Sequence, residues 1–366
     1  MGKAIYALLM CLAMAAPLAG NPESPRVAFT HLSLDEGLSQ SSVISLLQDR
    51  QGFVWLGTWD GLNRYDGYGF TVYRRIAGVP GSLASSQILS LGEDGAGRLW
   101  VGTGGGLHRY EPETGTFSSY PLDKAVVAAK GREQVLAIRL DRQGNLWVST
   151  ENGLYRVDPA TGAVRHLFET PEAGGGEWSG SVVVIFEDRS GRMWLGTNGA
   201  GLLCLDPRTG QIAKFRHDGR DPRSLSHDFI QAIVEDGDGR LWVGTLGGGL
   251  NRWERDGFAA WHHVPGDPDS LGSEEITALA PGPGGDLWVG TANAGVDRFD
   301  PAAGTFRHYQ NVSRDQSSLR NDIVQELLVD RTGRLWVGTL GGGVSVFDPS
   351  REKFHAYKTD PLDPNS

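Results

Sequence analysis

Cysteine is almost absent from this chain of 366 residues, which contains only Cys11 and Cys204. Cys11 lies in an apolar N-terminal segment, so a chain cleaved after that segment would keep Cys204 alone. One cysteine can form neither an intrachain disulfide nor a cysteine-based metal site. Cys204 stands in the apolar stretch 202–205, where we expect a small buried side chain.

Positive charge is also scarce, because 34 Lys and Arg stand against 44 Asp and Glu, for a formal net charge of −10. The basic residues do not cluster, whereas contacts with phosphates require clustered Lys and Arg. We therefore expect no nucleic-acid partner, and no membrane contact of the propeller itself. The motifs G-x-S-x-G, H-E-x-x-H and the P-loop are missing, and we expect no catalytic residue, cofactor or metal ion.

Long hydrophobic runs are limited to residues 4–16, which follow Lys3 and precede small residues. This arrangement predicts a secretory signal peptide over residues 1–20 and a periplasmic mature chain. The run is shorter than the roughly 20 apolar residues of a membrane span, although an uncleaved anchor is an alternative. No other segment of the sequence is long and apolar enough to cross a membrane.

Glycine and tryptophan are abundant, with 52 and 11 residues, and seven tryptophans recur at spacings of 45 to 48 residues. A Gly precedes each by three positions and a Thr follows each by three. An Asp precedes six of them by six positions, but Gly282 takes that place in the sixth copy. The seven tryptophans are Trp55, Trp100, Trp147, Trp194, Trp242, Trp288 and Trp336.

Each repeat contains four short strand patterns separated by turn residues such as Asp-x-x-Gly. This pattern predicts an all-β, seven-bladed β-propeller of four-stranded antiparallel blades over residues 21–358. Because the seven tryptophans occupy the same position in every repeat, we expect them to pack between blades and not to bind a ligand. An extra outer strand at 27–32 or the stretch 354–357 would complete the last blade.

The final residues, 359–366, match the connector that precedes each blade, as in Asp221 to Leu225 and Asp267 to Leu271. We therefore expect the sequence to be an N-terminal fragment of a longer protein. Symmetry is broken near the third and fourth copies, whose connectors lack Ser-Leu. The hairpins after Trp in copies one to three are also one residue shorter than those in copies four to seven.

The repeated pattern D-x-x-G-x-L-W-V-G-T-x-x-G-G-L-x-R, as in Asp236 to Arg252, resembles the two-component regulator propeller repeat. The resemblance covers about residues 27–366. It implies a periplasmic sensor region of a receptor that is anchored in the inner membrane by a missing downstream segment. It further implies a homodimeric full-length receptor with a histidine kinase or diguanylate cyclase output, and several family members sense carbohydrate breakdown products.

Propellers usually bind ligands on the face that carries the strand-two-to-three hairpins and the inter-blade connectors. Amides, carboxylates and aromatic rings there suit a small-molecule ligand such as an oligosaccharide. The ligand-binding candidates are Trp59, Asp60, Glu151, Asn152, Trp178, Asn198, His227, Asp228, Asn293, Asn321 and Asp322. Gln40, Gln87, Arg132, Glu133 and Glu274 occupy similar connector positions.

These candidates have structural alternatives, because Asn and Asp serve turn geometry by themselves. Trp178 could fill the place of a missing connector Leu. Two other functions also stay open: an exported propeller lyase or glycoside hydrolase, which would need paired carboxylates, and a periplasmic protein-binding scaffold. The sensor hypothesis is the one that the repeat favours.

Overall fold

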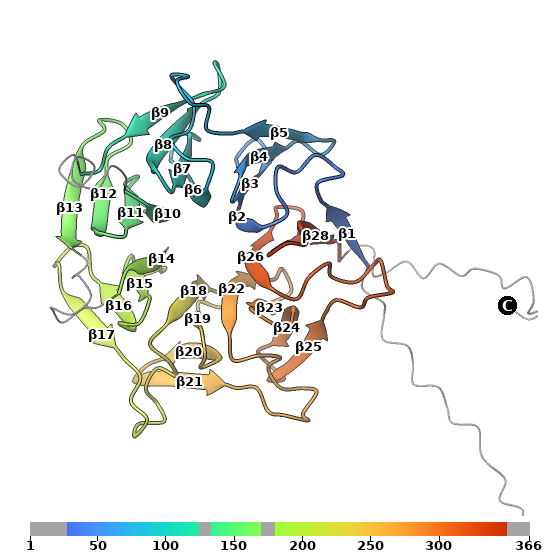
Figure 1. The fold of residues 1–366 in the computed structure, drawn as a ribbon. Coiled ribbons are helices and arrows are strands. Elements are labelled where there is room, and N and C mark those ends of the chain that lie inside the picture. The colour runs from blue at the N-terminus through green and yellow to red at the C-terminus, as the bar shows by residue number, and fades with distance from the viewer. Residues whose placement is uncertain (1–27, 124–132, 170–179, 350–366) are drawn as a thin grey trace, which may run out of the picture.

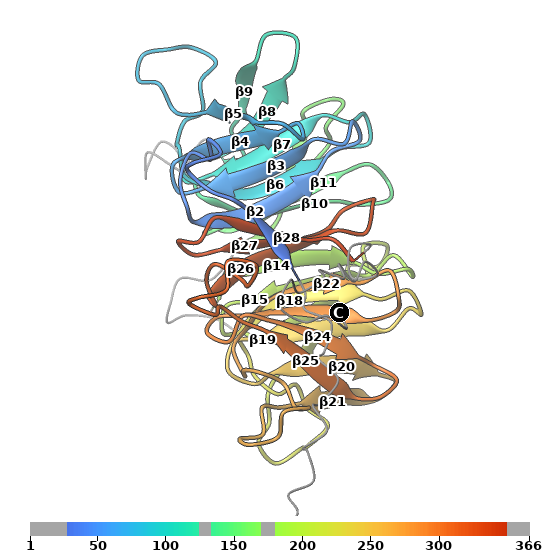
Figure 2. The same cartoon turned by 90° about the vertical axis from the view of Figure 1, so that its right-hand side faces the viewer.

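The computed structural model describes residues 28–123, 133–169 and 180–349, and these residues form seven four-stranded sheets arranged as a ring (Figure 1). Each sheet is antiparallel, and the ring is a disc when viewed from its side (Figure 2). The predicted seven-bladed propeller is therefore confirmed. The described part of the chain contains no helical segment with the length and hydropathy of a membrane span.

The strands follow one another outward from the ring axis. Blade 1 contains β2 (Val43–Gln48), β3 (Val54–Thr58), β4 (Gly61–Tyr65) and β5 (Phe70–Tyr73). Blade 2 contains β6 (Ile88–Glu93), β7 (Leu99–Thr103), β8 (Gly106–Glu111) and β9 (Thr116–Tyr120). Blade 3 contains β10 (Val135–Leu140), β11 (Leu146–Thr150), β12 (Gly153–Val157) and β13 (Val164–Glu169). Blade 4 contains β14 (Val182–Glu187), β15 (Met193–Thr197), β16 (Leu202–Leu205) and β17 (Ile212–Phe215).

The remaining blades follow the same plan. Blade 5 contains β18 (Ile230–Glu235), β19 (Leu241–Thr245), β20 (Leu250–Glu254) and β21 (Gly257–Trp261). Blade 6 contains β22 (Ile276–Pro281), β23 (Leu287–Thr291), β24 (Val296–Asp300) and β25 (Thr305–Tyr309). Blade 7 contains β26 (Val324–Val329), β27 (Leu335–Thr339), β28 (Val344–Phe347) and, as its outer strand, β1 (Phe29–Leu32).

Strand β1 closes the ring by pairing antiparallel with β28, with Phe29 opposite Phe347 and Leu32 opposite Val344. The buried Phe29 ring lies 5.8 Å from the ring of Phe347 and 6.4 Å from that of Tyr309. The closing strand is therefore the N-terminal one of the two predicted alternatives. The other, the stretch 354–357, lies outside the described residues, as do the predicted signal peptide and the final connector.

The seven repeated tryptophans are all buried, and each packs into the blade that follows its own. Trp242 of blade 5, for example, belongs to a cluster with Ile276 and Leu287 of blade 6. Trp336 of blade 7 contacts the core of blade 1 around Val54 and Leu56, which completes the circle. The expectation that these residues are packing anchors is confirmed.

A buried Asp in the first turn of most blades holds the tryptophan in place, and blade 5 shows the arrangement. Asp236 Oδ1 accepts hydrogen bonds from the backbone N–H groups of Asp238 (3.0 Å) and Arg240 (2.9 Å). Its Oδ2 accepts from Trp242 Nε1 and from Arg240 Nε, both at 2.8 Å. We call this arrangement the Asp–Trp clamp. The Asp–Trp bond recurs between Asp49 and Trp55, Asp94 and Trp100, Asp141 and Trp147, Asp188 and Trp194, and Asp330 and Trp336.

The clamp also controls the ionisation of its carboxyl group. Burial opposes the charged form of Asp236, but the bonds from Trp242 and Arg240 outweigh burial and lower the pKa. The pKa values of Asp94, Asp188 and Asp330 are lowered in the same way. A carboxyl whose pKa is lower in the folded state stabilises the protein above its unfolded-state pKa, and this contribution is lost as the pH falls through the folded-state value.

The substitution Asp236→Ala should therefore lower the free energy of unfolding by about 3 kcal/mol, because it leaves the indole N–H, two backbone N–H groups and Arg240 without their acceptor. Urea unfolding at pH 7 measures this change. Asp238→Ala in the same turn is the matched control, because Asp238 is 72% exposed and makes only a surface ion pair with Arg240. Equal effects of the two substitutions would show that the clamp does not stabilise the blade.

Candidate functional site

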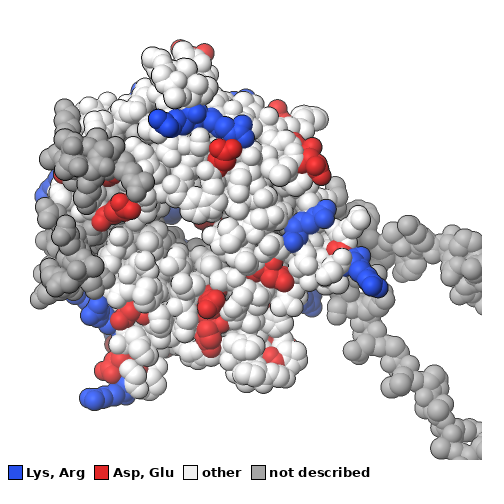
Figure 3. Space-filling model, viewed as in Figure 1, with Lys and Arg blue, Asp and Glu red and all other residues white. Residues whose placement is uncertain are grey.

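The antiparallel blades present two distinct faces. We call the side with the strand-two-to-three hairpins and the connectors the loop face, and the side with the Asp-x-x-Gly turns the turn face. On the loop face, hairpins bond to the connector of the next blade: the N–H groups of Gly247 and Gly249 both donate to Glu274 O at 3.0 Å. Figure 3 views the ring along its axis and shows several acidic side chains around the central opening.

Three connector acids have the same structural position. The carboxylates of Asp228, Glu274 and Asp322 accept hydrogen bonds from the backbone N–H groups at the start of their own connectors, at 2.8, 2.9 and 2.6 Å. Their carbonyl groups accept from hairpin glycines of the preceding blade. These acids therefore hold the loop face together. A role of Asp228 and Asp322 in ligand binding stays a prediction.

Trp59 is the predicted aromatic residue that the structure places in the open. Its side chain is 45% exposed and lines a shallow pocket of about 400 Å³ together with Gln87, Arg75 and Ala84. The neighbouring Asp60 accepts a hydrogen bond from Arg74 Nε at 3.1 Å. The pocket thus joins two of the predicted positions, Trp59 and Gln87, on blades 1 and 2.

The other candidates are distributed around the loop face. His227 stacks on the exposed Phe229 with 5.3 Å between ring centres, and Asn293 Nδ2 donates to Glu275 Oε2 at 3.3 Å. Asn321 Oδ1 accepts a hydrogen bond from the N–H of Ile323 at 2.7 Å, which is a bond typical of turns.

The candidates of blades 3 and 4 lie in the hairpins of those blades. The backbone N–H of Asn198 donates to Ser181 O, and that of Asn152 donates to Thr150 Oγ1. Glu151 is exposed in the blade 3 hairpin. Trp178 and Arg132 lie outside the described residues.

Glu133 was expected to be exposed on a connector, but its exposed fraction is only 2%. Its carboxylate accepts hydrogen bonds from Thr150 Oγ1 at 3.2 Å and from the N–H of Asp123 at 3.3 Å. Burial raises the pKa of Glu133 despite these bonds. This carboxyl group is therefore part of the blade 3 interior and is not presented to a ligand on the surface.

A buried Asp and a half-buried His in blade 6 form a pair that supports the connector in front of that blade. His308 Nδ1 lies 2.6 Å from Asp297 Oδ1, and Asp297 Oδ2 accepts from the N–H of Gly272 at 2.7 Å. The bond to Asp297 raises the pKa of His308, although burial opposes this. His308 Nε2 bonds to Pro268 O at 2.9 Å, so both ring nitrogens are occupied. The pair therefore resembles a catalytic dyad in composition but serves to hold a loop.

The central channel contains polar groups that are not among the predicted ligand-binding residues. A cavity of about 440 Å³ is lined by the innermost strands of all seven blades. The second residue of each inner strand is half-buried against it. This residue is apolar in blades 1 to 4 and polar in blades 5 to 7, in the order Ile44, Leu89, Leu136, Val183, Gln231, Thr277 and Gln325.

The channel thus has an apolar arc on four blades and a polar arc on three. The signal for it was present in the repeat, because a single strand position changes from apolar to polar after the fourth copy. The buried Thr277 Oγ1 has no hydrogen-bond partner within the described structure. An unpaired polar atom of this kind is unusual in a folded protein and marks this side of the channel.

Glu326 adds a carboxyl group to the polar arc. It is half-buried, and its Oε1 accepts a hydrogen bond from the N–H of Leu327 at 3.1 Å. Burial raises the pKa of Glu326 to about 7. Arg139 is the other charged side chain that the described residues contribute to the channel lining, and it lies against the Phe186 ring. The described part of the chain offers no group of three or more potential metal ligands.

The substitution Glu326→Gln should change how stability depends on pH. From the ordinary pKa of about 4.5 up to about 7, the folded wild type binds more protons than the unfolded chain, so its stability falls as the pH rises. Glu326→Gln removes this loss and should be more stable than the wild type above pH 7, by on the order of 1 kcal/mol because channel water screens the charge. Urea unfolding at a series of pH values measures the difference, and a constant difference from pH 4.5 to 8 would contradict this origin.

Comparisons with known proteins agree with this architecture. The family model described as Two component regulator propeller matches residues 37–60, 82–105, 131–152, 176–199, 224–247 and 318–341. These segments lie in every blade except blade 6. A histidine kinase of Formosa agariphila is 59% identical over 39 residues, which are 11% of this chain and 3% of that protein.

Solved structures show the same fold. The extracellular domain of a hybrid two component system from B. thetaiotaomicron superposes with a TM-score of 0.72 at 24% identity, over 88% of this chain and 42% of that one. Virginiamycin B lyase from Staphylococcus aureus gives 0.63 at 15% identity, over 88% of this chain and 98% of that one. The chain thus spans less than half of the hybrid-system domain. Six of the seven blades thus contain a segment that matches the two-component regulator propeller repeat.

Proposed function

We propose that this propeller is the extracytoplasmic ligand-sensing input domain of a membrane signalling receptor. The observation that carries the proposal is the set of six two-component regulator propeller repeats. The likeness of fold to the extracellular domain of a hybrid two component system is consistent with it. The output would be a histidine kinase or a diguanylate cyclase in another part of the full-length receptor, with the propeller in the periplasm.

We assign the ligand to the central channel, between its apolar arc and its polar arc. Its volume of about 440 Å³ lies within the range of small-molecule pockets, which is roughly 300 to 1,000 Å³. A sugar ring has apolar C–H faces and a rim of hydroxyl groups. Its faces would contact the apolar arc, whereas its hydroxyl groups would bond to Gln231, Thr277, Gln325 and Glu326. We therefore propose a mono- or oligosaccharide as the ligand class.

Signalling would follow from a shift of population. A ligand that contacts several blades at once favours the arrangement of blades that it fits best, and it can shift an equilibrium only by its difference in affinity for the two states. In a homodimeric receptor this preference would change how the two propellers are placed. The transmembrane output would respond to that placement.

We also propose that this chain is not itself an enzyme. A glycoside hydrolase needs two carboxyl groups that are free to exchange protons on either side of a substrate bond. Asp228, Glu274 and Asp322 instead accept backbone N–H groups of their connectors, and Glu133 is buried. The three connector acids therefore already serve the structure of the loop face on which a substrate would lie.

A thermal-shift screen of the chain against mono- and oligosaccharides tests the sensor proposal. A ligand present at a hundredfold excess over its dissociation constant stabilises the folded state by about 2.7 kcal/mol, so the melting temperature should rise and saturate. The double substitution Gln231→Leu with Gln325→Leu should abolish this shift, because it converts two polar positions of the channel to the apolar type of blades 1 to 4.

Gln211→Leu is the control, because it makes the same chemical change at an exposed turn of blade 4. If the melting temperature of the double variant still rises with ligand, the ligand binds outside the channel. A folded protein without any saturable shift across the panel would contradict carbohydrate sensing by this propeller.

A further inference from the structure

Blade 6 departs from the repeat at two linked positions. Blades 2, 4, 5 and 7 carry an Asp six residues before the tryptophan and an Arg two residues before it, and the two side chains bond to each other. Blade 6 has Gly282 and Asp286 at these positions. The same blade is absent from the segments that the family model matches. Its turn therefore cannot form the Asp–Trp clamp.

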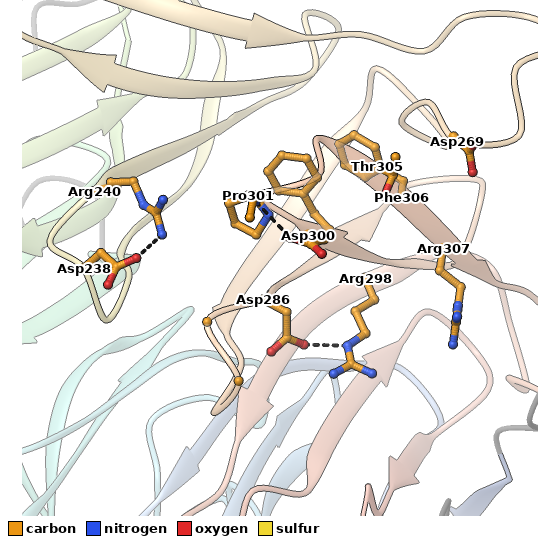
Figure 4. A pocket seen from close by; sticks show the side chains of 14 residues that line it. Asp238, Arg240, Asp269, Asp286, Arg298, Asp300, Pro301, Thr305, Phe306 and Arg307 are labelled. Atoms are coloured by element: carbon orange, nitrogen blue, oxygen red, sulfur yellow. Dashed lines mark hydrogen bonds and ion pairs between the residues drawn. The ribbon is translucent and has the colours of Figure 1, made fainter.

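The change leaves space on the turn face. Asp286 is shorter than the Arg that it replaces, and its Oδ2 accepts a hydrogen bond from Arg298 Nε at 2.6 Å. A pocket of about 590 Å³ lies here between the turns of blades 5 and 6 (Figure 4). The corresponding pocket between blades 1 and 2, where Arg98 is retained, has about 330 Å³. We call the larger one the turn-face pocket.

One oxygen of Asp286 and the guanidinium group of Arg307 have no hydrogen bond among the described residues. Asp286 Oδ1 is buried and has no hydrogen bond among the described residues. Arg307 is exposed, and no ion pair or hydrogen bond of its guanidinium group is found within residues 28–123, 133–169 and 180–349. An unsatisfied buried acceptor has a free-energy cost, which a donor group from outside the protein would remove.

The two arginines of the pocket stand directly opposite each other on β24 and β25. Figure 4 shows Arg298 and Arg307 extending in the same direction from these neighbouring strands. Like charges in such a pair repel, and a bound anion relieves the repulsion. Phe299 and Phe306 project from the opposite face of the same two strands, where they are buried and stack with 4.4 Å between ring centres.

We propose that the turn-face pocket binds a small carboxylate that also carries an amino or hydroxyl group, the class of the amino acids and hydroxy acids. The ligand carboxylate lies against Arg307 and Arg298, and the amino or hydroxyl group donates to Asp286 Oδ1. This site is independent of the proposed channel site, because the two share no lining residue.

A repair variant tests the proposal without damaging the fold. Gly282→Asp combined with Asp286→Arg recreates the arrangement of Asp236 and Arg240 in blade 5. Both changes are needed together, since a Cβ atom on Gly282 would collide with the present Asp286 carboxylate. Gly282 is not among the residues with positive φ, so its backbone accepts an Asp.

Isothermal titration of the chain with the twenty amino acids, lactate, malate and tartrate should find at least one ligand. The repair variant should bind it at least roughly tenfold more weakly while unfolding at the same or a higher urea concentration. Arg307→Ala should weaken binding by about tenfold, as expected for the loss of one charge-assisted bond. Arg165→Ala is the matched control, because Arg165 faces Arg156 in the same way in blade 3.

The proposal is overturned if none of these probes binds, or if the repair variant binds as tightly as the wild type. It is also overturned if Arg165→Ala weakens binding as much as Arg307→Ala does. The Gln231→Leu and Gln325→Leu substitutions should leave this binding unchanged, so failure of the channel site and failure of the turn-face pocket are distinguishable.

Discussion

The bond between a turn Asp and the indole N–H of the next strand is the interaction on which the ring depends. The tryptophan gives each blade its contact with the following blade, and burying its ring requires a partner for its one polar atom. The carboxylate that supplies this partner also closes the turn through two backbone N–H groups. A single buried side chain thus fixes both the hairpin within a blade and the joint between blades, which explains why the spacing from Asp to Trp is constant.

The sequence was sufficient to predict this framework because the framework repeats. Gly52 and Trp55, with their six counterparts, determine strand length and phase, and tight turns demand Gly and Asp for backbone reasons alone. Closure by β1 was predictable only as one of two alternatives, since Phe29 and Phe354 carry the same pattern. The contact of Phe29 with Phe347 depends on which end reaches blade 7, and that is a property of the whole ring.

The candidate site was less predictable. Connector acids such as Asp322 look like ligand-binding residues by composition. The sequence does not show that their carboxylates accept hydrogen bonds from backbone N–H groups. The polar arc was not predicted because Gln231 and Gln325 occupy an ordinary position in their strands. Only the closed ring brings these two residues to the same channel. The Gly282 exception was visible in the repeat, but the pocket that it opens also depends on Arg307, which lies outside the repeated pattern.

Blade 6 is the blade whose first turn lacks the carboxylate of the Asp–Trp clamp. Its tryptophan packs into blade 7, but Gly282 offers that indole no carboxylate, and its turn leaves a pocket at the joint with blade 5. The polar arc of the channel spans blades 5, 6 and 7. Both proposed sites therefore include residues of blade 6. A change in the position of blade 6 would therefore affect both proposed sites, because this blade contributes residues to each.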